Sequence, residues 1–480
     1  MGGFNSRLTK MRFALLMLLF VSVNDTYAQI RLPAFFSDNM VLQQETMASV
    51  WGTDKPNTAI TVTGSWNESA AATTDNNGKW KVKIQTPGAG GPYSLTIEGS
   101  NTLVLKNVLM GEVWICAGQS NMEMPLKGYN NQPVNGSNEA ILNAANSNIR
   151  LFTIERNASL TPLEDVQGEW FMADPQTAKD FSAVGYFYGR KINDLLDVPV
   201  GLISIVWGAS RVESWMDEET LSEFEEIEIA EEIPDKFPQH SPALLYNGMI
   251  HPIQGYAAKG FIWYQGESNI TKPDQYLQLF PAMIAQWRKQ WQQGKLPFYF
   301  VQIAPFKYWG NNPVYLREAQ LKSMQMVENT GMVVTVDIGD CDFIHPPEKR
   351  IVGERLAYWA LAKDYNFEGI ACSGPIYKAF KITTDGKIDL SFDACPNGLS
   401  SFGMPLSGFE IAGEDKVFYP ATATINENRT VTVFSEKVTN PVAVRYCFIP
   451  CPEGTLFNTE GLPASPFRTD DRDDAMQMGK

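Results

Sequence analysis

A serine in a tight turn is the first residue of this sequence that could do chemistry. Ser120 lies in the tetrapeptide Gly118-Gln119-Ser120-Asn121, directly after the apolar run 113–116. This pattern predicts a strand that ends in a turn with a hydroxyl group at its tip, which is where an α/β protein places a serine nucleophile. The alternative is an ordinary strand-to-helix turn in which Ser120 caps the helix. The tetrapeptide alone favours the capping role, because serines before helices are common.

A serine mechanism also needs a base, and the sequence has three histidines to supply one. His240 lies in a loop bracketed by prolines and is expected at the surface. His251 lies between apolar and turn residues, and we expect a partly buried histidine with a hydrogen-bond partner rather than a base. His345 follows the expected strand 332–337, so it belongs to the same edge of the sheet as Ser120.

Asp342 stands three residues before His345. In a tight loop the two side chains can converge, so that the carboxylate holds the imidazole tautomer while the other ring nitrogen takes the serine proton. The competing interpretation is that Asp342 caps a helix beginning near Glu348 and that His345 packs against the two prolines after it. These residues alone leave the two interpretations evenly balanced.

Two further segments at strand ends offer hydrogen-bond donors. Gly208 follows the expected strand 200–207, and residues 265–269 follow the expected strand 260–264. An acyl-transfer site needs donors aimed at the oxyanion that develops during the reaction. The N–H groups of Ser120 and Gly208, with a side-chain amide from Gln265 or Asn269, would supply three. The alternative for each segment is a turn with polar capping residues.

An alternating α/β core is required to bring these segments to one edge. Strands are expected at 113–116, 149–153, 200–207, 260–264, 298–303 and 332–337, and helices at 183–196, 273–292, 315–329 and 349–363. This alternation is typical of βαβ units around a mostly parallel sheet, here at residues 108–371. Residues 29–107 show short strands with Gly and Asn turns, which predicts a β-sandwich, and residues 372–480 form a second β-rich region.

Residues 1–28 are expected to be a secretory signal peptide. Basic residues precede an apolar run at 13–23, and small residues follow it. The run is too short to span a bilayer comfortably, and no other segment approaches ~20 consecutive apolar residues. We therefore expect a secreted or periplasmic protein with no membrane span after cleavage. An uncleaved anchor is the weaker alternative.

The charge and cysteine content of the chain disfavour several classes of binding partner and metal site. A formal net charge of −15 without a basic block makes nucleic acid and anionic membranes poor partners. Six cysteines in 480 residues are too few for a dense disulfide framework. Cys116 is expected in the core, and one or two bridges are expected among Cys341, Cys372, Cys395, Cys447 and Cys451, with the pairing open. The cysteine spacing does not fit a zinc site, and no metal or cofactor is expected.

Four blocks, in order, resemble the SGNH (GDSL-like) hydrolases and, within them, the sialate O-acetylesterase-type family. The blocks are Gly118-Gln119-Ser120-Asn121-Met122, Gly208, Gln265-Gly266-Glu267-Ser268-Asn269 and Asp342-x-x-His345. The segments 36–43, 246–250 and 461–468 are similar to other parts of the family pattern. The resemblance extends over nearly the whole chain after residue 28, and the combination of blocks is specific although no single block is.

The resemblance implies a flavodoxin-like three-layer α/β/α domain with a parallel sheet that removes O-acetyl groups from sugars. Carried over by position, Ser120 would be the nucleophile, His345 the base and Asp342 its orienting acid. Gly208 and an amide of the third block would complete the oxyanion hole. The substrate would be an O-acetylated sugar or oligosaccharide, with 9-O-acetyl sialic acid favoured over xylan and other plant polysaccharides.

This chain departs from the family pattern in two blocks, with GQSN in place of GDS and GESN in place of GxND. The second departure leads us to prefer Gln265 over Asn269 as the side-chain oxyanion donor. Glu267 is expected to brace its loop or to support the catalytic histidine. Asn121, Glu267 and Trp207 are also candidates for contact with the sugar.

Two other classes of function compete with this interpretation. One is a non-catalytic carbohydrate-binding protein built around a decayed hydrolase domain, against which the intact Ser120, Asp342 and His345 argue. The other is an esterase or lipase for longer acyl chains, which is disfavoured because no apolar segment resembles a lid.

Overall fold

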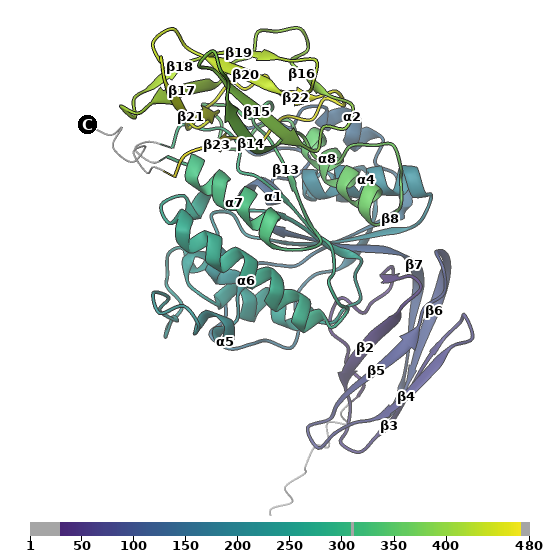
Figure 1. The fold of residues 1–480 in the computed structure, drawn as a ribbon. Coiled ribbons are helices and arrows are strands. Elements are labelled where there is room, and N and C mark those ends of the chain that lie inside the picture. Colours follow the sequence, from purple (N-terminus) through teal and green to yellow (C-terminus); the bar gives the residue numbers. More distant parts are fainter. Residues whose placement is uncertain (1–28, 309–311, 472–480) are drawn as a thin grey trace, which may run out of the picture.

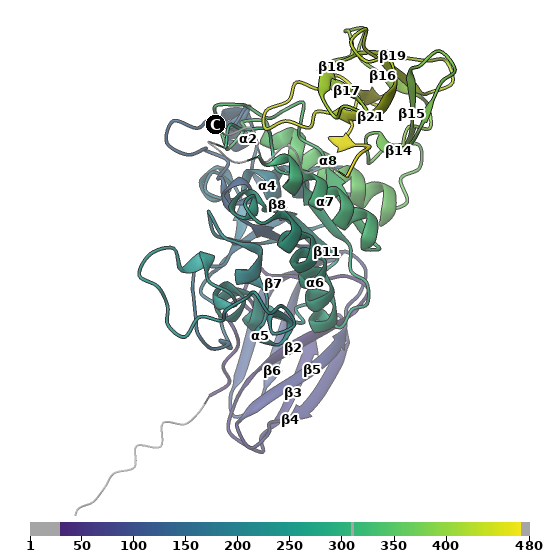
Figure 2. The same cartoon turned by 60° about the vertical axis from the view of Figure 1, so that its left-hand side comes forward.

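The computed structural model describes residues 29–308 and 312–471, so the expected signal peptide lies outside the described residues. The chain forms a central α/β domain with a β-rich region at either end. Figures 1 and 2 show the two β-rich regions on opposite sides of the α/β domain. Within the described part of the chain, no helix has the length and apolar character needed to cross a membrane.

The central sheet has the strand order β13-β12-β11-β7-β10-β8-β9. These strands are β7 (Thr102–Gly118), β8 (Asn146–Thr153), β9 (Trp170–Ala173), β10 (Val200–Val206), β11 (Gly260–Tyr264), β12 (Phe298–Val301) and β13 (Thr330–Val333). Neighbouring strands are parallel except β9, which runs antiparallel to β8. The parallel arrangement places the carboxyl ends of β7, β10 and β11 side by side.

Helices cover both faces of this sheet. Helices α4 (Ala183–Leu196) and α8 (Lys349–Lys363) share a core with Trp114 and Cys116 of β7. Helices α6 (Pro273–Trp291) and α7 (Val314–Met326) share the other core with alternate residues of the same strand, Val113, Ile115 and Ala117. Both faces of β7 are therefore buried from residue 108 onward, as expected for a parallel strand between two helical layers. The expected three-layer α/β/α fold is confirmed.

Most expected elements of this domain agree with the structure to within a few residues. The bounds of α4, α8 and β11 are those predicted. The expected strand 332–337 is wrong in its position, since β13 ends at Val333. Beyond that residue, side chains replace the strand ladder: Arg355 Nη1 donates to Val334 O (2.9 Å), and Thr335 Oγ1 donates to Gln302 O (3.0 Å). The chain thus leaves the sheet earlier, and a longer loop leads to His345.

The N-terminal region has two layers of strands. One layer pairs β2 (Met47–Thr53) with β5 (Lys79–Gln85). The other contains β3 (Ala59–Gly64), β4 (Ser69–Thr73), β6 (Gly90–Glu98) and the start of β7, with β1 (Val41–Gln43) also pairing with β7. Side chains from both layers meet in one core, among them Val50, Val82 and Val62. Strand β7 continues without a break into the central sheet, so the predicted boundary at residues 107/108 falls inside a strand.

The C-terminal region has a core of its own. Its two larger sheets have the orders β14-β15-β20-β19 and β18-β17-β21-β23, and β16 pairs with β22. The strands are β14 (Ile376–Ile382), β15 (Ile388–Asp393), β16 (Leu399–Ser400), β17 (Phe409–Gly413), β18 (Phe418–Pro420), β19 (Thr422–Ile425), β20 (Val431–Phe434), β21 (Pro441–Tyr446), β22 (Phe457–Asn458) and β23 (Phe467–Arg468).

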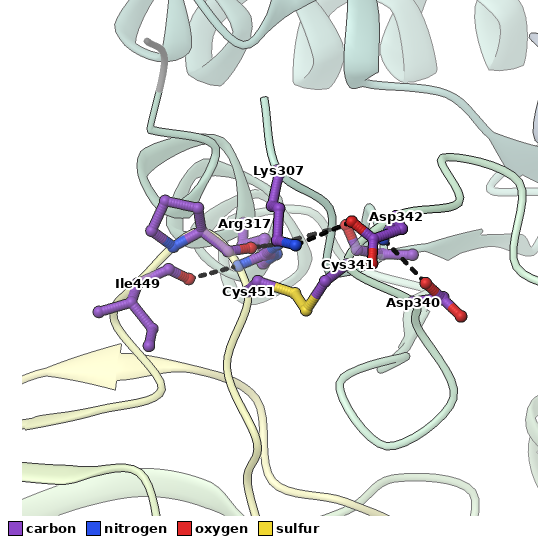
Figure 3. The surroundings of a disulfide bond; sticks show 9 residues. Lys307, Arg317, Asp340, Cys341, Asp342, Ile449 and Cys451 are labelled. Carbon is purple, nitrogen blue, oxygen red and sulfur yellow. Dashed lines mark hydrogen bonds and ion pairs between the residues drawn. A yellow bond between two sulfur atoms is a disulfide. The ribbon is translucent and has the colours of Figure 1, made fainter. Parts of the chain in front are cut away.

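A disulfide and a buried arginine tie this region to the α/β domain (Figure 3). Cys341 and Cys451, 110 residues apart in sequence, form the disulfide with a Cα–Cα distance of 5.6 Å. Arg317 of α7 donates to the carbonyl oxygens of Ile449 (3.1 Å) and Pro450 (2.7 Å). The expectation of at least one bridge is met, and Cys116 is a buried free thiol as expected.

Candidate active site

Three strand ends meet at one level of the sheet. Gly118, the last residue of β7, pairs with Val206 of β10 on one side and with Tyr264 of β11 on the other. Gly118 has a φ of 139°, and a Cβ atom there would lie 2.2 Å from the Tyr264 carbonyl oxygen. Only glycine permits this approach. The close contact places Ser120, the first residue of the short helix α1 (Ser120–Glu123), at the carboxyl edge of the sheet.

The structure brings Ser120 and His345 together. His345 Nε2 lies 2.7 Å from Ser120 Oγ, within the range expected for a nucleophile and its base. The other two histidines have different surroundings. His251 Nδ1 lies 2.8 Å from the Leu163 carbonyl oxygen, which confirms a histidine satisfied by a hydrogen bond. His240 is partly exposed and stacks on Phe237, which is 59% exposed, so it lies at the surface as expected.

The predicted pair of Asp342 and His345 is not formed. The Asp342 side chain is 71% exposed, and its Oδ1 accepts from Lys307 Nζ at 2.8 Å (Figure 3). His345 Nδ1 instead makes a short hydrogen bond to Gln132 Oε1. The loop explains the difference, because the Cys341 disulfide holds the segment beside Asp342 against the C-terminal region. Asp342 is therefore corrected from orienting acid to a surface ion-pair partner.

Gly208 also lies beside the nucleophile, but its N–H already has an acceptor. A Cβ atom on Gly208 would lie 3.4 Å from Ser120 Cβ. The Gly208 N–H donates to Glu123 Oε2 at 2.9 Å, and Arg156 Nε donates to the other carboxylate oxygen at 2.9 Å. The Arg156 guanidinium in turn lies over the ring of Trp207, 5.8 Å from its centroid. The Glu123 carboxylate thus accepts from the Gly208 N–H group, which was predicted to donate to the oxyanion.

The side-chain amide of Gln265 has two other acceptors, so its prediction as oxyanion donor is wrong. Its Nε2 donates to Ser210 O (3.0 Å) and to Asn269 Oδ1 (2.8 Å). Asn269 Nδ2 donates to Glu213 Oε2 at 2.9 Å, which also removes the alternative donor. All of these side chains are buried, where amide donors need partners. The two amides hold the loops after β10 and β11 together.

Asn121 and Glu267 are buried rather than exposed to a sugar, so their prediction as substrate contacts is wrong. Asn121 Nδ2 donates to Glu267 Oε1 (2.5 Å) and to the Ile344 carbonyl oxygen (3.0 Å). Lys349 Nζ donates to Asn121 Oδ1 at 2.5 Å. This network ties the residue after Ser120 to the residue before His345. It agrees with the expected role of Glu267 as a brace, which here joins its loop to the turn that carries Ser120.

Burial sets the charge state of these groups. Burial, and secondarily the positive charge of Lys349, lowers the pKa of His345 to about 4, so the imidazole is neutral at pH 7, as a base must be. Burial lowers the pKa of Lys349 to about 7 despite the nearby Glu267. Burial also raises the pKa of Glu267. Each shift follows from the cost of a charge in a poorly solvated place.

Four residues of this site were not predicted from the sequence. Gln132 and Tyr129 come from a loop with no recognisable motif, and the Tyr129 ring meets the His345 ring edge-on at 5.5 Å. Glu123 and Lys349 had a weak signal, since each lies three or four residues after a candidate catalytic residue. Among residues 29–308 and 312–471, no cluster of three or more His, Cys, Asp or Glu side chains is arranged to hold a metal ion.

A serine–histidine pair at the carboxyl edge of a parallel sheet, inside an α/β/α sandwich, matches an SGNH-type hydrolase fold. Residues 110–361 match the family model described as "Carbohydrate esterase, sialic acid-specific acetylesterase", which is more than half of the chain. The protein belongs to this family of carbohydrate esterases.

Known relatives agree with this assignment. The chain is 28% identical over 513 residues to the sialate O-acetylesterase of Mus musculus, covering 91% of this chain and 94% of that protein. It is 30% identical over 405 residues to the sialate O-acetylesterase of Homo sapiens, covering 75% and 76%. A crystal structure of a carbohydrate acetylesterase from Xanthomonas citri superposes with a TM-score of 0.85 at 38% identity, covering 92% of this chain and all of that one.

Proposed function

We propose that this protein is a carbohydrate O-acetylesterase that removes acetyl groups from sugar hydroxyls by acyl transfer through Ser120 and His345. The observation that carries the proposal is the 2.7 Å contact between His345 Nε2 and Ser120 Oγ, with the imidazole held neutral. Family membership and the names of the relatives support the substrate class.

The reaction proceeds in two steps. Ser120 Oγ attacks the acetyl carbonyl carbon while His345 Nε2 takes the hydroxyl proton, and His345 then returns this proton to the departing sugar oxygen. The product of the first step is acetyl-Ser120 and the free sugar hydroxyl. Water then attacks the acetyl-enzyme with His345 again acting as base, which releases acetate and restores the serine.

The oxyanion needs donors in both steps. The candidate donors are the N–H groups of Ser120 itself and of Gly208, where an added Cβ atom would lie 3.4 Å from Ser120 Cβ. Because Gly208 N–H is bonded to Glu123 in the free protein, the substrate oxygen has to displace that carboxylate to reach it. Arg156 would retain the displaced Glu123 side chain through the other carboxylate oxygen.

The favoured substrate is a sialic acid with a 9-O-acetyl group. The description of the matching family and the names of the mouse and human relatives support this choice over xylan. We further propose that the protein is exported to an oxidising compartment. The signal-like pattern of residues 1–28 and the disulfide between Cys341 and Cys451 support this location.

The test is acetate release from an aryl acetate, from 9-O-acetyl sialic acid and from acetylated xylan oligosaccharides. We expect the wild-type protein to hydrolyse the aryl acetate and to prefer the sialic acid ester among the sugars. Ser120→Ala and His345→Ala should each lose several orders of magnitude in kcat, while His251→Ala should stay within about twofold of wild type. Full activity in Ser120→Ala would refute the mechanism, and preference for xylan would reassign the substrate.

A further inference from the structure

The two ring nitrogens of His345 must have opposite roles if the imidazole is to act as a base. Nε2 faces Ser120 Oγ and must offer a lone pair to the serine proton, so the neutral ring must carry its own proton on Nδ1. A hydrogen-bond acceptor is therefore required at Nδ1. The acceptor in this structure is Gln132 Oε1.

The residue that the sequence pattern offered for this role is held elsewhere. Asp342 Oδ1 accepts from Lys307 Nζ, and the Asp342 backbone N–H donates to Asp340 Oδ1 at 2.8 Å. The disulfide of Cys341 and the Lys307 N–H, which donates to the Cys341 carbonyl oxygen at 3.1 Å, fix the same turn. These contacts hold the Asp342 carboxylate beside Lys307 (Figure 3), where its side chain is largely exposed.

Gln132, in contrast, stands on a segment tied to the histidine loop. The backbone N–H groups of Tyr129 and Gln132 each donate to the other residue's carbonyl oxygen at 3.0 Å, which closes a tight loop. Asn135 then donates from its backbone N–H to the Pro347 carbonyl oxygen (3.0 Å) and from its side chain to Glu348 Oε1 (2.5 Å). Both contacts lie within three residues of His345. They fix the position of the segment that carries Gln132 relative to the loop that carries His345.

We infer that Gln132, rather than Asp342, is the positioning residue for His345, so that the site is a serine–histidine–glutamine arrangement. The inference rests on the proposed function, because it concerns the same base. An amide oxygen fixes the tautomer and the ring orientation, as a carboxylate would. It adds no negative charge, however, and so it does not stabilise the imidazolium in the way that a carboxylate does.

The charges around the imidazole are consistent with a neutral partner. Lys349 is the charged group that lowers the pKa of His345 electrostatically. Glu267 lies behind Asn121, Glu123 is bonded to Arg156 and Gly208, and Tyr129 presents a ring edge to the imidazole. Neither of these carboxylates takes the Nδ1 position.

The experiment compares Gln132→Ala, Gln132→Glu and the matched control Asp342→Asn on one acetyl ester over a range of pH. We expect Gln132→Ala to lower kcat about 100-fold or more with KM changed by less than about threefold, because the base His345 loses its fixed tautomer and orientation while the binding site is kept. Gln132→Glu should retain activity, and its acid limb in kcat/KM should move to higher pH by about one unit or more, because a carboxylate at Nδ1 raises the pKa of His345. Asp342→Asn should stay within about twofold of wild type.

An NMR titration of the His345 ring in the same variants provides a readout that does not depend on turnover. We expect the imidazole pKa to rise in Gln132→Glu and to be unchanged in Asp342→Asn. The inference is overturned if Asp342→Asn loses activity to the extent expected of Gln132→Ala, or if Gln132→Glu leaves the imidazole pKa unchanged. Failure of the proposed function would appear differently, as undiminished activity in Ser120→Ala and His345→Ala.

Discussion

At the scale of single residues, Lys349 is the charged group that most affects when His345 can act as a base. Lys349 is buried below the site and reaches it through Asn121. Its pKa of about 7 means that it carries its charge at the pH where His345, with a pKa of about 4, would take a proton. Like charges oppose each other, so Lys349 keeps His345 neutral to lower pH.

The acid limb of the pH profile follows from these charges. In wild type, kcat/KM should hold steady as pH falls from 7 and should be lost as pH falls through about 4, where His345 becomes protonated. Lys349→Met removes the positive charge, so the pKa of His345 should rise and the limb should move to higher pH. Steady-state kinetics from roughly pH 3 to pH 8 measure the acid limb of wild type and of Lys349→Met.

Stability provides the control for this variant. Lys349→Met leaves the buried side-chain oxygen of Asn121 without its donor and Glu267 without a nearby positive charge, which should cost on the order of 3 kcal/mol in unfolding free energy. Lys322→Met removes a lysine with a 47% exposed side chain. It should change neither the unfolding free energy nor the position of the acid limb measurably. An acid limb that stays in place in folded Lys349→Met protein would contradict the electrostatic role of Lys349.

At the scale of secondary-structure elements, the end of β7 positions the nucleophile through one glycine. Gly118→Ala would put a methyl group 2.2 Å from the Tyr264 carbonyl oxygen at a positive φ. We expect a loss of more than about 3 kcal/mol in unfolding free energy, because a clash with backbone adds to the conformational strain. Any folded protein should have a displaced Ser120 and a strongly reduced kcat.

A matched glycine separates the clash from the strain. Gly294 has a positive φ of 76°, but nothing lies within 4 Å of the position that an added methyl group would take. Gly294→Ala should therefore cost only about 1–2 kcal/mol, the conformational part alone. Equal losses for the two variants in denaturant unfolding would show that the approach of Gly118 to β11 is not what makes glycine necessary.

The elements were largely predictable because the signals that define them are local. Alternation of apolar residues and the lengths of the segments give the bounds of α4, α8 and β11. The early end of β13 was not predictable, since it depends on Arg355 and Thr335 side chains that take over the backbone carbonyls. Such contacts join residues that no local pattern connects.

The residues of the site also fall into those that the sequence predicted and those that depend on contacts between distant segments. Ser120 directly follows β7, and His345 lies on the loop that leaves β13, so the sheet topology brings both to the same edge. Gln132 reaches His345 from a loop 213 residues away in sequence, so no local pattern connects the two residues. The spacing of Asp342 and His345 predicted a hydrogen bond between them, but the disulfide-linked loop does not bring their side chains together. The side-chain amides of Gln265 and Asn269 were predicted as oxyanion donors because they follow a strand. The structure shows instead that both are buried and bonded to each other, which the spacing of residues does not reveal.

At the scale of the whole molecule, the C-terminal region holds the histidine loop in place. The Cys341–Cys451 disulfide and the Arg317 contacts to Ile449 and Pro450 join that region to the domain that carries the site. Arg468 adds a paired contact to Glu318 of α7 at 2.9 Å through two nitrogens. The β-rich end is thus connected to the segment that begins a few residues before His345.

The disulfide should therefore contribute to global stability. A closed loop of 110 residues corresponds to roughly 4–5 kcal/mol of denatured-state entropy in the loop-closure model. We expect the Cys341→Ser/Cys451→Ser protein to unfold at clearly lower denaturant, and reductant to lower the stability of wild type to the same level. Reductant should leave the double variant unchanged, and a wild type insensitive to reductant under unfolding conditions would contradict the assignment.

The most direct test of the central claim is to trap the acetyl-enzyme. Wild-type protein is mixed with an aryl acetate, quenched in acid within milliseconds to seconds, digested and examined by mass spectrometry. We expect one acetyl group on the peptide that contains Ser120, absent from Ser120→Ala. An acetyl group on another residue, or steady acetate release with no acetylated Ser120 in wild type and full turnover in Ser120→Ala, would contradict the account.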